Sequence, residues 1–313
     1  MVSGAKGIAC SGLILVLAGA LQASPLFNLG AAKNFTVLQV GAGTVSQATA
    51  GTQGQIVGNV GIYTNGKISS NGPQVSGDLY LGNGSTGQFS GSYSNNRPVT
   101  GMAHLGIGAS VGPGSYTFTT MSDNPQTLLN QARTDAMNAS TAAQGLTATS
   151  ALTKIDSTMT LSGSGVYNLT SVNLASNEVL TLSGNAGDSI VLNISDMFKL
   201  NDAKIVLTGG LLESNVLFNF VGTKDVNVAG NSALSELHGI LLALNAKVAL
   251  SPGLVVGEII SARDIAVDSG AIVRMMQTGP NTVPDNAPTF ALLAVAFAAV
   301  IGAKRFVPRR LSA

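Results

Sequence analysis

Val57-Gly58-Asn59-Val60-Gly61-Ile62 is the clearest copy of a short phrase that decides the fold. The phrase places a Gly close behind an apolar residue and then continues with alternating apolar positions. Further copies occur at Val75–Leu81 and Val255–Ile260, with looser ones at Val99–His104 and Leu237–Leu241. Alternation of this kind predicts short β-strands, and the flanking Asn, Gly, Ser and Pro residues predict turns.

The glycines of the phrase recur at a regular spacing. Gly58 and Gly77 lie about 19 residues apart, and Gly239 and Gly257 about 18, within the periods of repeat architectures. A strand this short cannot bury its apolar face alone, whereas coils stacked on one another can. The sequence therefore predicts a mostly β fold, a right-handed-type β-solenoid over residues 24–276. A β-sandwich with ordinary strand spacing is the alternative.

Composition excludes several classes of function. The 313 residues carry a net charge of +1, and only 10% of them are charged. Nucleic-acid binding needs a basic field that this chain lacks. The single cysteine, Cys10, lies in the N-terminal leader described below, so we expect no disulfide and no thiolate metal site in the mature chain. We expect no cofactor.

The periodicity changes to that of a helix at about residues 125–145. Apolar residues recur there at steps of three and four, namely Leu128, Ala132, Ala136, Ala139, Ala143 and Leu146. Asn124 is a candidate N-cap, Pro125 suits a first helical turn, and Gly145 suits a helix stop. We expect one long helix on the flank of the solenoid. An amphipathic membrane helix is the other option, although Arg133 is the only cation on its polar face.

Residues 1–23 have the pattern of a secretory signal peptide. Lys6 precedes the apolar core Leu13–Ala18, and small residues then lead to a predicted cleavage between Ala23 and Ser24. The core is short for a bilayer span, which favours cleavage over an uncleaved N-terminal anchor.

The C-terminus has three parts in order. A polar linker at residues 277–288 contains Val283, Pro284 and Asp285, and residues 289–313 hold an apolar run, Phe290–Ala303, followed by the basic residues Lys304, Arg305, Arg309 and Arg310. This tail resembles bacterial PEP-CTERM-like sorting signals of the Val-Pro-Asp variant, although Asn286-Ala287 stand where that pattern usually has Ser-Gly. The resemblance implies a C-terminal transmembrane helix, and an exosortase-type membrane enzyme as partner, which removes the tail during export. A plain membrane anchor is the alternative.

A second resemblance covers roughly residues 34–273. The order of Asn215–Phe220, a Val-Asn-Val strand, Leu237–Ala246 and Val255–Ala262 resembles the choice-of-anchor A family of exported bacterial proteins. The layout also looks like the ice-binding-protein-like solenoid, in which a long helix packs beside the coils. These resemblances imply a fold and surface display, and they supply no catalytic residues.

Ionisable residues are scattered rather than grouped. His104 and His238 lie near repeat glycines without a neighbouring ligand in the sequence, so we expect solvated or turn-bonded side chains rather than a zinc site. If the coils stack in register, Asp78 and Glu258 occupy equivalent positions on distant coils. They are the candidates for a catalytic carboxylate pair, should the chain act on polysaccharides.

Ice binding requires a flat face of regularly spaced Thr and small residues. Thr158, Thr160, Thr170 and Thr181 are candidates, but we expect that they do not recur at one coil position. The charged residues Lys199, Asp202, Lys204 and Lys224 would interrupt such a face.

The sequence therefore predicts an exported, non-enzymatic surface or extracellular-matrix protein with a structural or adhesive role. We expect it at the cell envelope, the outer surface or outside the cell, with transient or permanent membrane anchoring through its C-terminal helix. An extracellular polysaccharide or matrix is a possible partner. An ice-binding protein is the first alternative, and a polysaccharide-acting β-helix enzyme is the second.

Overall fold

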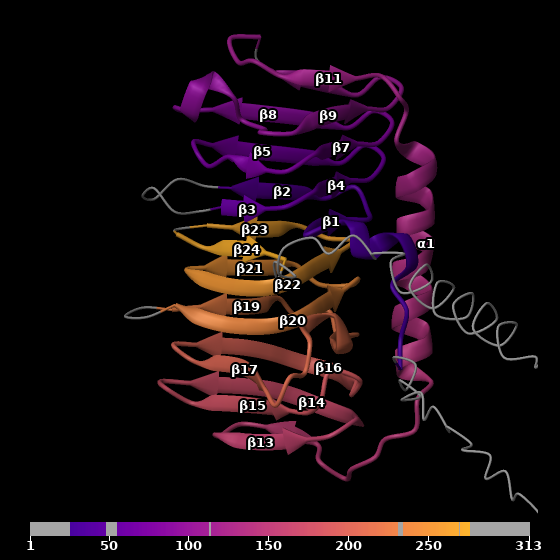
Figure 1. Ribbon diagram of the computed structural model, residues 1–313, viewed down its shortest axis with the longest axis vertical. Coiled ribbons are helices and arrows are strands. Elements are labelled where there is room, and N and C mark those ends of the chain that lie inside the picture. The colour runs from indigo at the N-terminus through magenta and orange to yellow at the C-terminus, as the bar shows by residue number, and fades with distance from the viewer. Residues whose placement is uncertain (1–25, 48–54, 113, 231–233, 269, 276–313) are drawn as a thin grey trace, which may run out of the picture. The chain divides into compact units, whose positions relative to one another are not determined.

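The computed structural model describes residues 26–47, 55–112, 114–230, 234–268 and 270–275. Within these residues, 24 strands form one continuous network in which every strand pairing is parallel. The strands wind in coils with three sides, and a single α-helix runs along the flank (Figure 1). Parallel coils confirm the β-solenoid and exclude the sandwich, which is built from antiparallel sheets.

The pairings divide the strands into three faces. We name one face after the helix that covers it and the other two after one of their strands. The helix-covered face contains β1 (Val37–Gln39), β4 (Val60–Ile62), β7 (Leu79–Leu81), β9 (Met102–Leu105), β11 (Thr119–Met121) and β18 (Val216–Phe220). The β2 face contains β2 (Thr44–Gln47), β5 (Lys67–Asn71), β8 (Thr86–Ser90), β10 (Ser110–Gly112), β12 (Lys154–Ile155), β19 (Val226–Ala229), β21 (Val248–Ser251) and β23 (Ile265–Val267).

The third side, the β3 face, contains β3 (Gln55–Val57), β6 (Val75–Ser76), β13 (Met159–Ser162), β15 (Val179–Ser183), β17 (Lys204–Thr208) and β24 (Ile272–Arg274). Four longer strands turn a corner and contribute to two faces: β14 (Gly165–Ala175), β16 (Ile190–Asn201), β20 (Ser235–Ala243) and β22 (Gly253–Ser261). Three short 3-10 helices complete the elements: η1 (Gly30–Asn34), η2 (Ser94–Asn96) and η3 (Glu213–Asn215).

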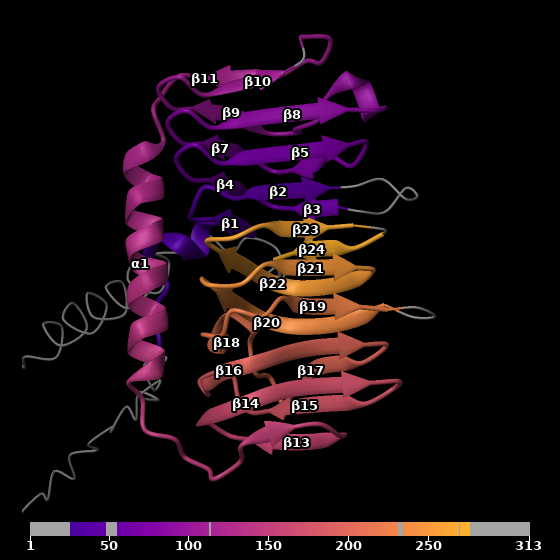
Figure 2. The same ribbon diagram turned by 180° about the vertical axis from the view of Figure 1, so that it is seen from behind.

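The coils do not stack in the order of the sequence. Val37 of β1 pairs with Val60 of β4 on one side and with Ile259 of β22 on the other. The first coil therefore lies in the middle of the stack, where the indigo coils meet the yellow ones (Figures 1 and 2). We call residues 37–121 the N-terminal block and residues 154–274 the C-terminal block. The helix carries the chain from the far end of the first block to the far end of the second.

The helix, α1 (Gln126–Gln144), confirms the predicted range. Pro125 is its N-cap and Gly145 its C-cap, and no side chain caps the N-terminus, so the prediction of Asn124 as the cap is wrong. Its buried apolar residues are Leu129, Ala132, Ala136, Ala139 and Ala143. Leu129 is fully buried, whereas Leu128, which was expected on the buried face, is half-buried. These small side chains let the helix pack closely on Leu38, Leu217 and Ile260 of the helix-covered face.

The repeat glycines sit at the corner between the β3 face and the helix-covered face. Gly239 and Gly257 have φ angles of 135° and 144°, a region that L side chains rarely adopt. A Cβ at Gly257 would also collide with the backbone carbonyl oxygen of Gly239 in the neighbouring coil. The corner therefore requires glycine both for its turn and for the close approach of coils.

Among the described residues, none belongs to a helix with the length and hydropathy needed to cross a bilayer. The predicted signal peptide at 1–23 and the predicted linker and tail from residue 277 onward lie outside the described residues.

Candidate binding surfaces

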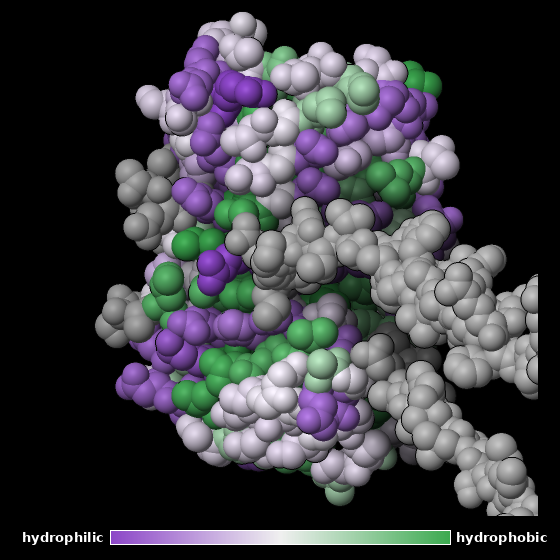
Figure 3. All heavy atoms as spheres, in the orientation of Figure 1, coloured by the Kyte–Doolittle hydropathy of each residue, from purple (hydrophilic) through white to green (hydrophobic). Residues whose placement is uncertain are grey.

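The two faces without the helix differ in the side chains they present. On the β2 face, the outward positions are dominated by Ser, Thr, Asn and Ala, with scattered Lys and Asp. On the β3 face, three half-buried outward apolar residues lie on neighbouring strands, namely Leu254 of β22, Ile272 of β24 and Val57 of β3, and the buried Val256 (4% exposed) lies beside them on β22. We call this group the apolar patch. Figure 3 shows hydrophobic residues interspersed with polar ones over the visible side of the molecule.

The apolar patch lies between charged side chains. Arg274 occupies the register position between Val57 and Val256, and the Lys204–Glu236 ion pair (2.6 Å) lies beyond Leu254. Contiguous apolar surface with a polar border is typical of a binding surface. The 3-10 helix η3 packs against β20 and β22 on the side of Val256, and Glu213 of η3 contacts His238, the register partner of Val256.

Hydroxyl side chains form a regular array at the end of the β3 face nearest β13. Thr160, Thr181 and Val206 share one register column, and Ser162, Ser183 and Thr208 share the next. Neighbouring residues within one column are about 4.8 Å apart, which is the distance between strands. The two columns are about 6.6 Å apart, which is the distance between alternate residues along a strand. The expectation that the threonines would not recur at one coil position is therefore wrong for Thr160 and Thr181.

The charged residues that were expected to interrupt a threonine face lie in different parts of the fold. Lys199 and Asp202 lie on or beside β16 where it joins the β2 face, and Lys224 forms an ion pair with Asp196. Only Lys204 lies beside the array, in the register column of Val179. Thr170 sits at the bend of β14 and not on the array.

The register also places the two candidate catalytic carboxylates. Glu258 precedes Ile259, which aligns with Val37, Val60 and Leu79, so Glu258 and Asp78 occupy the same column as predicted. Thr36 and Asn59 stand between them, which separates the two backbones by three strand spacings, about 14 Å. Two groups so far apart do not act on one glycosidic bond.

Glu258 is also inaccessible to a substrate. The residue is 8% exposed, and its Oε2 atom has no hydrogen-bond partner among the described residues. Burial raises the pKa of the Glu258 carboxyl group to about 8, and the positive charge of Lys33 partly opposes that shift. The carboxyl group is therefore neutral at pH 7, at the junction of the two blocks.

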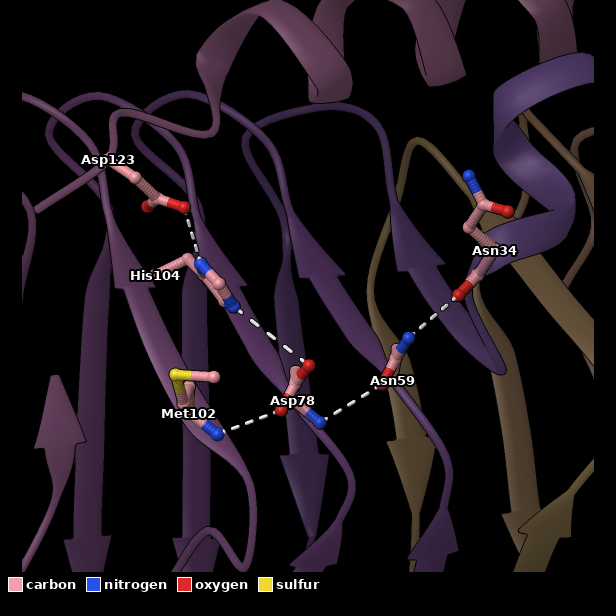
Figure 4. Close-up of polar contacts among 6 residues, drawn as sticks. All are labelled: Asn34, Asn59, Asp78, Met102, His104 and Asp123. Carbon is pink, nitrogen blue, oxygen red and sulfur yellow. Dashed lines mark hydrogen bonds and ion pairs between the residues drawn. The ribbon is translucent and has the colours of Figure 1, made fainter. Parts of the chain in front are cut away.

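The residue that follows the repeat glycine links one coil to the next. The Asn59 side chain donates to the Asn34 carbonyl (3.2 Å) and accepts from the Asp78 backbone N–H (3.0 Å). Asp78 in turn accepts from the Met102 N–H (2.8 Å), which extends the chain of contacts across four coils (Figure 4). The Gly-Asx part of the repeated phrase thus supplies side-chain bonds between coils.

His104 ends this chain of contacts. Its ring stacks on Tyr80 with centroids 4.3 Å apart, its Nδ1 lies 2.7 Å from Asp123, and its Nε2 lies 3.9 Å from Asp78 (Figure 4). Burial, followed by the charges of Asp78 and Asp123, raises the pKa of the Tyr80 hydroxyl. His104 itself is 8% exposed, so the expectation that its side chain is solvated or turn-bonded is wrong.

His238 likewise has a carboxylate partner, Glu213, at 3.0 Å. Sequence spacing missed both pairs because the partners come from neighbouring coils, 19 and 25 residues away. No three His, Cys, Asp or Glu side chains in the described part of the chain are placed to hold a metal ion. These histidines join coils, and His104 also ties the last coil of the N-terminal block to the segment that enters α1.

Fold and surfaces together define a three-sided parallel β-solenoid with one face covered by a helix and two faces available for binding. The chain belongs to the family of ice-binding-like adhesive domains, whose model matches residues 26–270. No curated protein matches the sequence.

Solved structures with a similar fold include ice-binding proteins. One is the antifreeze protein LeIBP from an Arctic yeast, with 21% identity, a TM-score of 0.52, and coverage of 83% of this chain and 99% of its own. Another is an ice-binding protein from an Antarctic bacterium of the Flavobacteriaceae, with 18% identity and a TM-score of 0.52. That match covers 85% of this chain and 52% of the bacterial one. At these identities the likeness establishes the fold alone.

Proposed function

We propose that the chain is an exported, non-enzymatic adhesive protein that is displayed at the cell surface or in the extracellular matrix. Membership in the adhesive-domain family supports this proposal. The observation that carries it is the apolar patch, in which the side chains of Val57, Leu254 and Ile272 are half-exposed on a face that α1 does not cover.

The proposal includes export and tail processing. Residues 1–23 act as a signal peptide cleaved between Ala23 and Ser24, and the Val283-Pro284-Asp285 motif directs an exosortase-type enzyme to the tail. The apolar run and its basic end, Lys304, Arg305, Arg309 and Arg310, hold the chain in the membrane until then. Varied C-terminal anchoring of this kind agrees with the resemblance to the choice-of-anchor A family.

Mass spectrometry of both termini in fractionated native cells tests export and processing. A mature chain that begins near Ser24 and ends near Asp285 supports the proposal. An intact tail in the inner-membrane fraction contradicts tail removal, and a chain with residues 1–23 in the cytoplasm contradicts export.

A retention assay tests adhesion itself. The full chain is expected to remain bound to cells, or to matrix from its own source, that lack the gene. Release of all the protein by a low-salt wash would contradict an adhesive role.

Ice binding is the second candidate, favoured by the array of Thr160, Thr181, Ser162, Ser183 and Thr208. If the array orders water, Thr181→Tyr disrupts its flatness and abolishes inhibition of ice recrystallisation. Thr170→Tyr is the matched control, because Thr170 is exposed but lies off the array. Equal inhibition by both variants, or none by the unmodified chain, rules this candidate out.

A further inference from the structure

A groove on the β2 face has no role in the fold described so far. It has a volume of about 550 Å³ and lies over β5, β8 and β10. Its polar lining consists of Ser69, Thr86, Gln88, Ser90 and Ser110, and Gly112 leaves one side open. It lies in the N-terminal block, away from both the apolar patch and the hydroxyl array.

The register makes the polar lining regular. Thr86 pairs with Ser110 and Ser69 pairs with Gln88, and these four side chains point outward from adjacent strands. They therefore stand about 4.8 Å apart across strands and about 6.6 Å apart along a strand. The groove offers an extended ligand a grid of donors and acceptors rather than a single contact.

The hydrogen-bonding capacity of this grid is unused. No side-chain hydrogen bond joins Ser69, Thr86, Gln88, Ser90 or Ser110 to another described residue. Neighbouring serines behave differently, since the Ser70 hydroxyl donates to the Pro73 carbonyl (2.7 Å) and the Ser85 hydroxyl to the Tyr63 carbonyl (2.6 Å). The outward side chains are thus free to bind a ligand, whereas the inward ones hold the coils.

The lining carries no charged side chain, and its one aromatic, Phe89, is 2% exposed. Hydroxyl and amide groups without charge recognise a ligand that is itself rich in neutral hydroxyls. The lining itself offers anionic ligands no arginine or lysine, although Lys67 of β5 stands beside it as the register partner of Thr86, and apolar ligands would leave the polar groups unpaired.

We propose that the groove over β5, β8 and β10 binds a neutral polysaccharide chain. This inference rests on the proposed adhesive function and names the ligand class for one surface. The polysaccharide lies along the groove and exchanges hydrogen bonds with Thr86, Gln88 and Ser110. Because Gly112 has no side chain, it leaves space for the sugar rings.

The glycine provides a variant that fills the groove without disturbing the fold. A Cβ at Gly112 would have no heavy atom within 4 Å, so Gly112→Leu places its side chain in open space. Gly187→Leu is the matched control, because Gly187 has the same open surroundings and lies outside the groove. Gln88→Ala removes the longest polar side chain of the lining.

Affinity electrophoresis of the full chain tests the proposal in gels that contain dextran, galactomannan, soluble β-glucan or, as the anionic comparison, alginate. We expect at least one neutral polysaccharide to slow migration, a loss of about tenfold or more in affinity for Gly112→Leu and Gln88→Ala, and no change for Gly187→Leu. Retardation by alginate alone, no retardation in any gel, or equal retardation of Gly112→Leu would overturn it.

The retention assay separates this inference from the proposed function. Retention on cells without polysaccharide binding overturns the groove assignment and leaves adhesion intact. Polysaccharide binding without retention on cells supports the groove and contradicts cell-surface adhesion.

Discussion

The two blocks of the solenoid reach the same architecture by different means. Strands of the N-terminal block have at most five residues, as in β5 and β8, whereas β14 and β16 of the C-terminal block have 11 and 12. Short strands form few ladder bonds and bury little apolar area, so side chains such as Asn59 and Asp78 add bonds between coils. Long strands rely on a continuous apolar interior. Strand length therefore sets which interaction holds the stack together.

The C-terminal block also has polar bonds, but these lie beneath the helix. Asn168, Asn193 and Asn219 are in register and donate to one another, with Asn193 donating to Asn168 at 3.0 Å and Asn219 to Asn193 at 2.8 Å. Asn219 also exchanges hydrogen bonds with Ser140 of α1. This ladder joins three coils to one another and also fixes the helix against them.

The largest expected effect comes from the apolar interior of the C-terminal block. Phe218 is fully buried and meets Phe198 edge-on at 5.7 Å. We expect Phe218→Ala to lower the free energy of unfolding by about 3–5 kcal/mol, because it leaves a cavity. Phe118→Ala in the N-terminal block, where the ring is half-buried, should cost less than half of that. Urea denaturation measures both, and equal losses would remove the distinction between the blocks.

The junction of the blocks should respond to pH through Glu258. Its pKa is about 8 in the folded state and about 4.5 in the unfolded chain. Between these values the folded state holds a proton that the unfolded state has lost, so stability falls as pH rises through this window. The loss over the whole window is at most about 5 kcal/mol, because one pKa unit corresponds to about 1.4 kcal/mol.

Glu258→Gln removes this titration, so the variant should lose less stability between pH 5 and pH 8 than the unmodified chain. Melting temperatures of both proteins across this range provide the measurement. Parallel pH profiles would show that Glu258 ionises without cost in the fold.

The smallest effects should come from single polar bonds. Asn219→Ala removes the acceptor of the Ser140 hydroxyl and the donor to the side-chain oxygen of Asn193, both at buried sites, and we expect a cost of about 1–3 kcal/mol. Asn59→Ala in the N-terminal block, at a half-buried site, should cost about 0.5–1.5 kcal/mol. Hydrogen exchange of α1 should rise only in the first variant. Increased exchange of α1 in both would contradict separate roles for the two ladders.

Much of the fold was predictable because it depends on local pattern. Alternation, recurring glycines and the change to helical periodicity gave the solenoid and a helix within one residue of each observed end. The predicted buried face of the helix began with Leu128, whereas the observed one begins with Leu129. The two residues are adjacent in the sequence, and packing against the coils determines which of them is buried.

The order of the coils was not predictable from these patterns. The repeated phrase occurs in both blocks, so nothing in it indicates that β1 inserts beside β22, more than 200 residues away. The same limit hid the partners of His104 and the alignment of Thr160 with Thr181, because coil lengths vary and register follows from stacking. The polar lining of the groove was hidden for the same reason.

The apolar patch is the central element of the proposed function, and one pair of variants tests it most directly. Leu254→Asp places a charge in the patch, whereas Ser251→Asp places one at an exposed position of the β2 face, away from the groove. Retention of each full-length variant on native cells or matrix is the measurement. We expect Leu254→Asp to weaken retention about tenfold or more and Ser251→Asp to leave it unchanged, with both variants folded by circular dichroism. Unchanged retention of a folded Leu254→Asp variant would contradict adhesion through this patch.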